Sequence, residues 1–275
     1  MMIYDCFIFF NEFELLEVRL HELTGVVDKF VLVEATRTHA NKPKPLHFQE
    51  NRARFSSFAD RIIHIVVDDS PDSADAWVIE RFQRNCISRG LVDCRPDDLI
   101  MVSDADEIPR ATTVRELHER MRYTDNVVAR LAHRVVKRIS SIKPLRKEFR
   151  KFHPYVWGLQ QTGYCYFLNC PTLAPWYGTH VVRYRDFSIA DEIRYSGYHT
   201  VDNGGWHFSS MGGVERVRQK LASYAHQELN TPEFTDPERV RARMENDVRA
   251  VPVDESFPLH IRTHQDKFST WIKAP

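Results

Sequence analysis

The chain has 275 residues, of which 43% are hydrophobic and 28% charged, an ordinary composition for a globular protein. Its 38 basic and 38 acidic residues balance, so no net charge draws the protein to nucleic acid or to an anionic membrane. No apolar run approaches the roughly 18 residues that a membrane-spanning helix needs. The length suits one large α/β domain, or one domain with a C-terminal extension.

The first half of the chain alternates strand and helix patterns. Apolar runs predict four strands: Ile3–Phe10, Lys29–Ala35, Arg61–Val67 and Asp98–Ser103. Apolar residues at helical spacing predict helices over Phe13–Leu23 and Ala74–Arg89. This alternation is typical of an α/β fold with a mainly parallel central sheet and helices on both faces. Such sheets bind ligands beyond the carboxyl ends of their strands.

The second half is less regular. It contains three aromatic-rich or glycine-rich strand patterns and two helix patterns, over Gln160–Asn169, Thr179–Tyr184, Gly204–Ser209, Val214–Ala225 and Pro237–Val248. A further strand pattern covers Val127–Leu131. The segment Arg130–Lys151 then carries nine Lys or Arg residues against one Glu. A solvated helix explains this charge, and a surface that faces an acceptor or a membrane is the alternative.

The most informative motif follows the fourth predicted strand, where Asp104, Asp106 and Glu107 come together. Close carboxylates raise each other's pKa, and a divalent cation removes that repulsion. Mg²⁺ and Mn²⁺ prefer hard oxygen ligands and often share them with substrate phosphates. The motif therefore indicates a site for a metal and a diphosphate, although a polar turn with Asp as a helix cap also explains it.

Other polar side chains are expected near this edge of the sheet. Arg81, Arg84 and Asn85 fall within about one turn of the preceding helix, and an Arg side chain can donate paired hydrogen bonds to phosphate. Phe10–Asn11 and Glu34 follow the first two strands, where nucleotide base and ribose contacts are common; caps and turns explain them equally well. We expect these residues and Asp104–Ala105 to contact the donor, the ligand that carries the nucleotide and the diphosphate.

A glycine-rich strand ends in Trp206 and His207, and a neutral imidazole of this kind can bind a metal, although such a histidine is often a core residue. Glu215 begins the next helix and is one candidate for a general base that deprotonates a hydroxyl; Asp202 is the other. The helix dipole alone also favours an acidic residue at the position of Glu215.

Several segments resemble glycosyltransferase family 17, the family that includes β-1,4-mannosyl-glycoprotein β-1,4-N-acetylglucosaminyltransferase. They lie in order between residues 4 and 230: YDCFIFFNEFELLEVRLHEL, DKFVLVEATRTHANKPKPLHF, ERFQRN, DDLIMVSDADEIPR, PWYGTHVVRYRDF and NGGWHFSSMGGVERVRQKLASYAHQELN. The resemblance implies a GT-A type nucleotide-sugar-binding domain over residues 1–230. Residues 231–275 are then expected to be an extension packed on the same domain.

The resemblance also implies inverting transfer of N-acetylglucosamine from UDP-N-acetylglucosamine to a glycan hydroxyl. Asp104 and Asp106 match the Asp-x-Asp motif that binds Mn²⁺ or Mg²⁺, and His207 is expected as a further ligand. We expect Glu107, Trp176, Tyr177 and Trp206 to contact the acceptor, the aromatic rings by stacking on sugar faces. The alternatives are a sugar-phosphate nucleotidyltransferase and an inactive nucleotide-sugar or glycan-binding module.

The N-terminal run Met1–Phe10 has neither the basic start nor the cleavage site of a signal peptide, and it fits a buried strand better. The family's Golgi members begin with a membrane anchor that we do not find here. We therefore expect a cytoplasmic enzyme of the bacterial type, acting on a lipid-linked glycan, a polysaccharide or a small glycoside. Peripheral membrane contact would then involve Arg130–Lys151.

Overall fold

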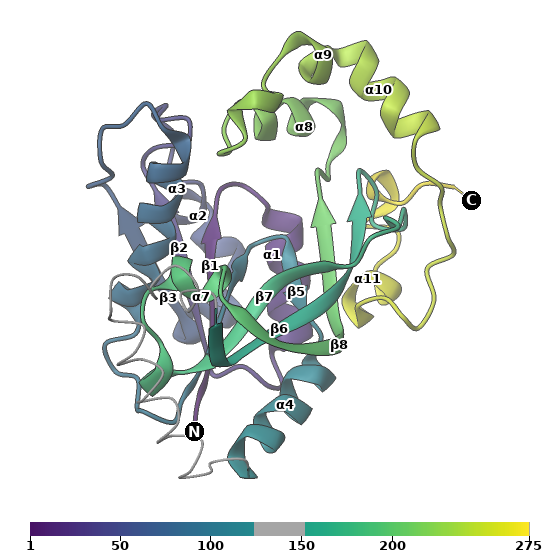
Figure 1. Ribbon diagram of the computed structural model, residues 1–275. Helices are drawn as coiled ribbons and strands as arrows, with labels where there is room; N and C mark the ends of the chain where they lie inside the picture. The colour runs from purple at the N-terminus through teal and green to yellow at the C-terminus, as the bar shows by residue number, and fades with distance from the viewer. Residues whose placement is uncertain (124–151, 275) are drawn as a thin grey trace.

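The computed structural model describes residues 1–123 and 152–274 (Figure 1). These residues form an eight-stranded sheet with the order β3-β2-β1-β4-β7-β6-β8-β5. The strands are β1 (Ile3–Phe9), β2 (Lys29–Ala35), β3 (Ile62–Val67), β4 (Leu99–Asp104), β5 (Glu107–Pro109), β6 (Phe152–Cys165), β7 (Trp176–Arg183) and β8 (Gly197–Ser209). The pairs β2–β3, β1–β2, β1–β4 and β6–β8 are parallel, and the other three are antiparallel. The predicted mixed α/β class with a mostly parallel sheet is confirmed.

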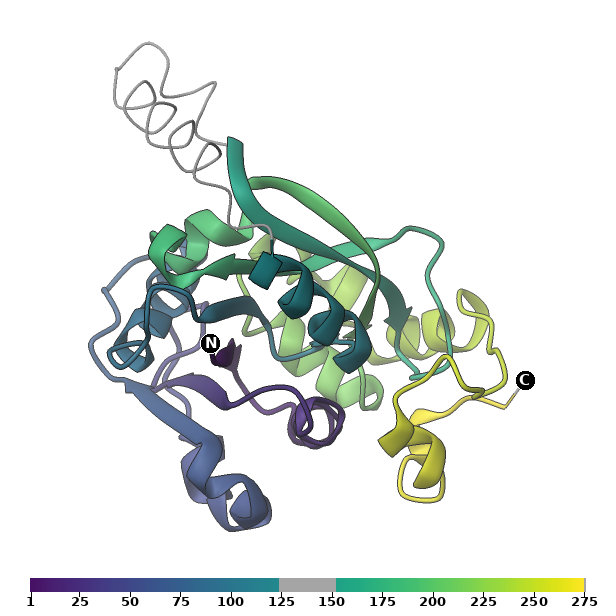
Figure 2. The same cartoon turned by 90° about the horizontal axis from the view of Figure 1, so that it is seen from below.

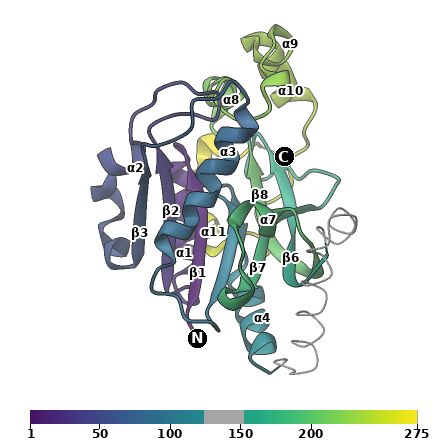
Figure 3. The same ribbon diagram turned by 60° about the vertical axis from the view of Figure 1, so that its left-hand side comes forward.

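Helices cover both faces of the sheet (Figures 1 and 3). The α-helices of the described residues are α1 (Phe13–Leu23), α2 (His47–Glu50), α3 (Ala76–Asn85), α4 (Ala111–Tyr123), α7 (Ala190–Arg194), α8 (Gly213–Leu221), α9 (Pro232–Thr235), α10 (Pro237–Asn246) and α11 (Leu259–Thr263). No helix in this part of the chain is long and apolar enough to cross a membrane.

Alternating side chains of β1 explain the two layers of helices. Ile3 and Phe7 belong to a core shared with α1 and α4, whereas Tyr4 and Cys6 belong to a second core shared with α7. All four side chains are buried. Because successive residues of a strand point to opposite faces, a strand with apolar residues on both faces, such as β1, needs cover on both sides.

The predicted elements of the first half closely match the structure. The helix over residues 13–23 and the strand over 29–35 have the expected bounds. The predicted helix 74–89 is divided into α3 and a 3₁₀ turn, Cys86–Gly90. Asp75 caps α3 by accepting a hydrogen bond from the backbone of Trp77, which explains why the helix begins at residue 76. The predicted strand over residues 127–131 lies outside the described residues.

The second half departs further from prediction because its strands are longer than their apolar runs. Strand β7 begins at Trp176 rather than residue 179, and β8 begins at Gly197 rather than residue 204. Strand β6 begins at Phe152 rather than residue 160, although it ends at Cys165, four residues before the predicted end. Backbone pairing with neighbouring strands extends all three elements through polar and glycine-containing sequence, which a hydrophobic pattern does not reveal.

The segment after β8 lies at one end of the sheet. Helices α8, α9 and α10 extend beyond the ends of β1 and β8, while α11 lies beside α1 (Figures 1 and 2). Phe257, Ile261 and Phe268 share an apolar core with Leu15 and Val18 of α1. This contact places the last part of the described chain against its first helix.

Candidate active site

A cavity of about 680 Å³ opens at the carboxyl end of the parallel strands. Its walls come from the ends of β1 and β4, the segment after β2, helix α3, the start of β7, helix α7, the end of β8 and helix α8. Asp104, Ala105, Asp106 and Glu107 all line it, so the motif found in the sequence lies in the cavity. This is the edge at which open α/β sheets bind ligands.

A buried ion pair holds the backbone of the acidic motif. The guanidinium of Arg19, on α1, donates to both carboxylate oxygens of Asp5 on β1 at 2.7 and 2.6 Å. Its remaining nitrogen donates to the backbone carbonyls of Asp104 and Glu107, each at 2.9 Å. Both side chains are fully buried, so the pair is a rigid support beneath the motif. Sequence reasoning missed it; the signals were an Asp within an apolar strand and an Arg within an apolar helix face.

Two arginines neutralise the first aspartate. Arg84 of α3 donates to Asp104 Oδ1 at 3.2 Å, and Arg194 of α7 donates to Asp104 Oδ2 at 2.9 Å. Burial alone would raise the pKa of Asp104, but the two guanidinium groups outweigh it and hold that pKa well below its usual range. Asp104 is therefore a carboxylate at neutral pH, with both oxygens already in hydrogen bonds.

The second aspartate faces a lysine and a histidine. Lys220 Nζ of α8 donates to Asp106 Oδ2 at 2.8 Å, and His207 Nε2 of β8 lies 3.8 Å from the same oxygen. Burial again opposes ionisation, but the charge of Lys220 lowers the pKa of Asp106. The sequence analysis did not single out Lys220 or Arg194, because both follow in the chain more than 80 residues after the motif that they neutralise.

Glu107 links the motif to the aromatic wall. It accepts hydrogen bonds from the Asp104 backbone at 2.8 Å, from Arg194 at 2.7 and 2.6 Å, and from Trp176 Nε1 at 2.6 Å. The Trp176 ring stacks on His207, with centroids 4.5 Å apart. Trp176 and Tyr177 are 41% and 38% exposed and line the cavity, so both predicted aromatic residues present surface to a ligand.

Most of the other predicted contact residues do not line the cavity. Glu34 is buried, where it accepts hydrogen bonds from the backbone of Phe48 and Gln49. Arg81 is largely exposed and pairs with Asp191, and Asn85 accepts a hydrogen bond from the Asp191 backbone. The remaining ones are Arg84, which is buried and donates to Asp104; Asn11, whose side chain donates to Gln219; and Trp206, which is 1% exposed and donates to the Ser256 carbonyl. Phe10 does line the cavity.

The two carboxylates expected as general base also lie outside the cavity lining. Glu215 is 79% exposed and pairs with Arg218 on the same helix. Asp202 is exposed within β8, several residues before the strand's cavity end. Glu12, which follows Phe10–Asn11 at the end of the first strand and was not expected as a base, does line the cavity. Burial, followed by the nearby charge of Asp106, raises the pKa of Glu12 above its ordinary value.

The residues around Asp106 fit a divalent cation. Asp106 Oδ2 and His207 Nε2 are 3.8 Å apart, a separation that two ligands of one cation can have, and they supply one hard oxygen and one imidazole. Asp104 fits less well as a direct ligand because Arg84 and Arg194 occupy both of its oxygens. The donor set is thus one carboxylate and one histidine, with room for phosphate oxygens, provided that Lys220 releases Asp106.

Comparison with known proteins matches the part of the chain that carries the acidic motif. Residues 1–136 match the family model described as glycosyltransferase family 17. The match includes the acidic motif, Arg19 and Glu12, and it ends before β7 and β8, so the resemblance noted up to residue 230 is wider than the matched range.

Curated proteins similar to this chain carry the name β-1,4-mannosyl-glycoprotein 4-β-N-acetylglucosaminyltransferase. The human and rat proteins are each 36% identical over 107 residues, and the mouse protein is 35% identical over 107 residues. Each alignment covers 36% of this chain and 20% of the relative. The chain thus matches about a fifth of the length of these relatives.

Among solved structures, the chain is similar to 2-C-methyl-D-erythritol 4-phosphate cytidylyltransferase of Francisella tularensis. The two are 10% identical, the TM-score is 0.36, and the alignment covers 74% of this chain and 90% of that one. A TM-score this low supports no conclusion about shared fold or function.

Proposed function

We propose that the protein is a glycosyltransferase with a GT-A type fold that moves N-acetylglucosamine from UDP-N-acetylglucosamine to a hydroxyl of a glycan acceptor. The family match of residues 1–136 and the names of the curated relatives support the reaction class and the sugar. The observation that carries the proposal is the placement of Asp104 and Asp106 in a cavity at the carboxyl end of the sheet, where cationic side chains surround them.

The donor diphosphate would lie over the acidic motif. Lys220 and Arg194 place positive charge in the cavity within 3 Å of the two aspartates. Once the diphosphate is bound, this charge would stabilise the negative charge that grows on UDP as it leaves. The nucleoside would extend toward the ends of β1 and β2, where Phe10 and Lys44 also line the cavity.

We propose Asp106 and His207 as the protein ligands of a divalent cation, Mn²⁺ or Mg²⁺. Bound there, the cation would act as a Lewis acid on the leaving diphosphate. Asp104 would contribute by keeping Arg84 and Arg194 in place beside the motif. Lys220 would exchange Asp106 for a phosphate oxygen, because an ammonium group binds either anion as a point charge.

The acceptor sugar would occupy the aromatic side of the cavity. Trp176 and Tyr177 have exposed rings at the start of β7, and Tyr195, the residue after α7, lines the same cavity. Stacking on such rings orients the apolar face of a sugar while its hydroxyl groups remain free to react. The Trp176 ring is held in place by its hydrogen bond to Glu107 and by His207 beneath it.

Inversion needs one base that removes the proton from the attacking hydroxyl. Glu12 is the carboxylate that we favour, because it faces the cavity and its raised pKa makes it a stronger base than an ordinary glutamate. Phe10 and Asn11 donate backbone hydrogen bonds to Glu12 Oε2 at 3.0 Å, which fixes the side chain. Glu215 and Asp202 are the sequence-based alternatives, and both would have to approach the cavity first.

Incubation of the full chain with UDP-N-acetylglucosamine, Mn²⁺ and an acceptor-glycan array tests the proposal. We expect release of UDP and a β-linked product on a subset of the glycans. Release of pyrophosphate from a nucleoside triphosphate and a sugar phosphate would instead identify a nucleotidyltransferase. Binding of the nucleotide sugar without turnover would identify a binding module. Either result overturns the proposed activity.

A further inference from the structure

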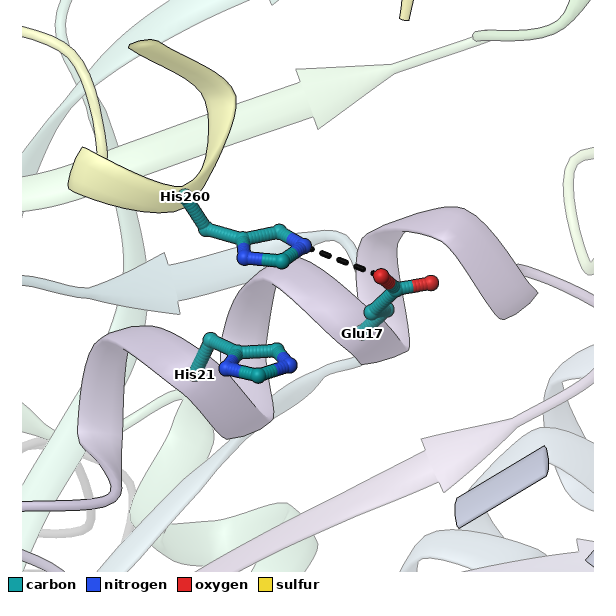
Figure 4. Close-up of side chains that lie close together, drawn as sticks. All are labelled: Glu17, His21 and His260. Atoms are coloured by element: carbon teal, nitrogen blue, oxygen red, sulfur yellow. Dashed lines mark hydrogen bonds and ion pairs between the residues drawn. The ribbon is translucent and has the colours of Figure 1, made fainter. Parts of the chain in front are cut away.

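A second group of chemically reactive side chains lies on α1, away from the cavity lining. Glu17 and His21 are one helical turn apart on α1, and His260 of α11 packs against them (Figure 4). Among the residues that the structure describes, this is the one group of at least three His, Cys, Asp or Glu side chains whose ligand atoms all lie within 4.8 Å of one another. It therefore meets the first geometric requirement of a metal centre.

The two imidazole rings are arranged in parallel. The rings of His21 and His260 stack with centroids 4.1 Å apart and an interplanar angle of 4°. Figure 4 shows that each ring presents a nitrogen toward the side on which the Glu17 carboxylate lies. Glu17 Oε1 accepts a hydrogen bond from His260 Nε2 at 2.9 Å. The three ligand atoms thus lie within 4.8 Å of one another. Because the rings are parallel, one of them would have to tilt for both nitrogens to bind the same metal.

Hydrogen bonding within the protein accounts for only part of this arrangement. His260 has Glu17 as its partner, and Lys267 donates to the same Glu17 oxygen. His21 has ring contacts with His260 and Phe58, but within the described part of the chain neither of its ring nitrogens has a hydrogen-bond partner. A cation bound between the three side chains would use this free nitrogen and the lone pair of the carboxylate.

We propose that Glu17, His21 and His260 bind a divalent transition metal of the Zn²⁺ type and that this metal fastens α11 to α1. Two imidazoles and one carboxylate form a donor set that proteins use for Zn²⁺, with a fourth position for water. Imidazole nitrogen selects zinc and its neighbours over Mg²⁺ and Ca²⁺, which prefer oxygen. This site is chemically distinct from the one proposed around Asp106.

A metal at this position would compete with the ammonium group that now contacts the Glu17 carboxylate. Lys267, which is about half exposed, can turn outward when a metal takes its place.

The metal would add to an interface that already exists. Ile261 and Phe268 pack with Leu15 and Val18 of α1 in an apolar core, so α11 is positioned without a ligand. The three side chains are then held close together by this packing, and the metal-free protein remains folded. Because Arg19, which supports the acidic motif, lies between Glu17 and His21 in α1, a metal here would also make the helix that carries this support more rigid.

Titration of the full, EDTA-treated chain with Co²⁺ and then Zn²⁺ tests the inference. Co²⁺ reports its own coordination by visible absorption, and Zn²⁺ should displace it. We expect the Asp106→Ala variant to retain one equivalent of tightly bound Co²⁺, since its mutation removes only the other site. Zn²⁺ in hundredfold excess over its Kd should raise Tm by roughly 5 °C or more.

Three variants identify the ligands. His21→Ala removes an exposed side chain, so folding is preserved. We expect this variant to bind the one equivalent of Co²⁺ at least about a hundredfold more weakly. Glu17→Gln keeps the size of the side chain and should do the same. His264→Ala is the matched control, because His264 lies against the His260 ring but outside the group. Unchanged Co²⁺ binding in His21→Ala and Glu17→Gln, or loss in the control alone, would overturn the proposal.

Discussion

Lys220 Nζ donates a hydrogen bond to Asp106 Oδ2 at 2.8 Å, although the two residues are 114 positions apart in the sequence. Helix α8 reaches this position after Gly212 and Gly213, whose φ angles of 93° and 86° other residues rarely adopt. A Cβ atom on Gly212 would also come within 2.4 Å of the Arg216 side chain. The two glycines thus direct α8 over the cavity, and its lysine completes the charge balance of the acidic motif.

The Asp106→Ala variant should lose at least about a hundredfold of its transfer rate, which is typical for removal of a main electrostatic element. Its Tm should fall only slightly, since Lys220, which loses its partner, is 31% exposed and can reach solvent. Asp104→Ala should lose activity as well, but with a lower Tm, because the buried guanidinium groups of Arg84 and Arg194 then lose a partner. Activity assays with and without Mn²⁺ and thermal unfolding distinguish the two. Full wild-type activity in EDTA would contradict the metal assignment.

The Arg19→Met variant should be destabilised by about 3–5 kcal/mol, because it leaves the carboxylate of Asp5 buried without a partner. The matched control is the double variant Asp5→Leu with Arg19→Met, in which no unpaired charge remains. We expect the control to regain part of the free energy of unfolding in urea, but not the activity, since the carbonyls of Asp104 and Glu107 still lack their donor. Equal stability of the two variants would argue against a charge effect.

Stability should fall on acidification because of His180. Burial, and then the nearby charge of Arg194, lower the pKa of His180 from 6.5 to about 3. Between these two pH values the unfolded chain binds a proton that the folded chain does not, so the free energy of unfolding decreases as pH falls. From pH 6.5 to 5 this contribution is about 2 kcal/mol. Urea unfolding at both pH values measures it.

The His180→Gln variant should remove that part of the pH dependence, and His226→Gln, which changes an exposed histidine, should leave it in place. If both variants kept the slope of the wild type, the proton would be taken up elsewhere.

The Trp176→Ala variant should raise the KM for the acceptor about tenfold, the equivalent of one stacking interaction of about 1.4 kcal/mol. The KM for the nucleotide sugar should change much less. Trp176→Phe keeps a ring but loses the hydrogen bond to Glu107, so it separates stacking from support of the motif. A raised donor KM with an unchanged acceptor KM would place the ring on the donor side instead.

Local patterns predicted the elements of the first half because each strand and helix there is buried by its own apolar residues. The same logic found Asp104 and Asp106, since both lie next to an apolar strand. It did not find Arg194 or Lys220, which reach the motif only through the folding of distant segments. A side chain that reaches the site only through long-range contacts cannot be recognised from its neighbours in the sequence.

The same limit applies to the two tryptophans that were predicted to contact the acceptor. Trp206 and Trp176 are equally conspicuous in the sequence, yet the first is 1% exposed and the second 41%. Strand β8 runs between β6 and β5, and Trp206 points into the apolar core that includes Phe208 and Ile261. Which tryptophan faces the cavity depends on the position of its strand in the sheet, and composition does not give that position.

The sequence and the structure favour different residues as the general base. A true base changed to its amide should lose turnover by roughly 10²–10⁴-fold while donor binding stays intact. We expect this of Glu12→Gln, because Glu12 lines the cavity with a raised pKa, and not of Glu215→Gln, whose carboxylate pairs with Arg218 in solvent. The rate of Glu12→Gln should also lose the acidic limb of its pH profile. A near-normal rate for Glu12→Gln, with loss of turnover in Glu215→Gln or Asp202→Asn, would identify the inactive variant's residue as the general base. Helix α8 or strand β8 would then have to move toward the acceptor.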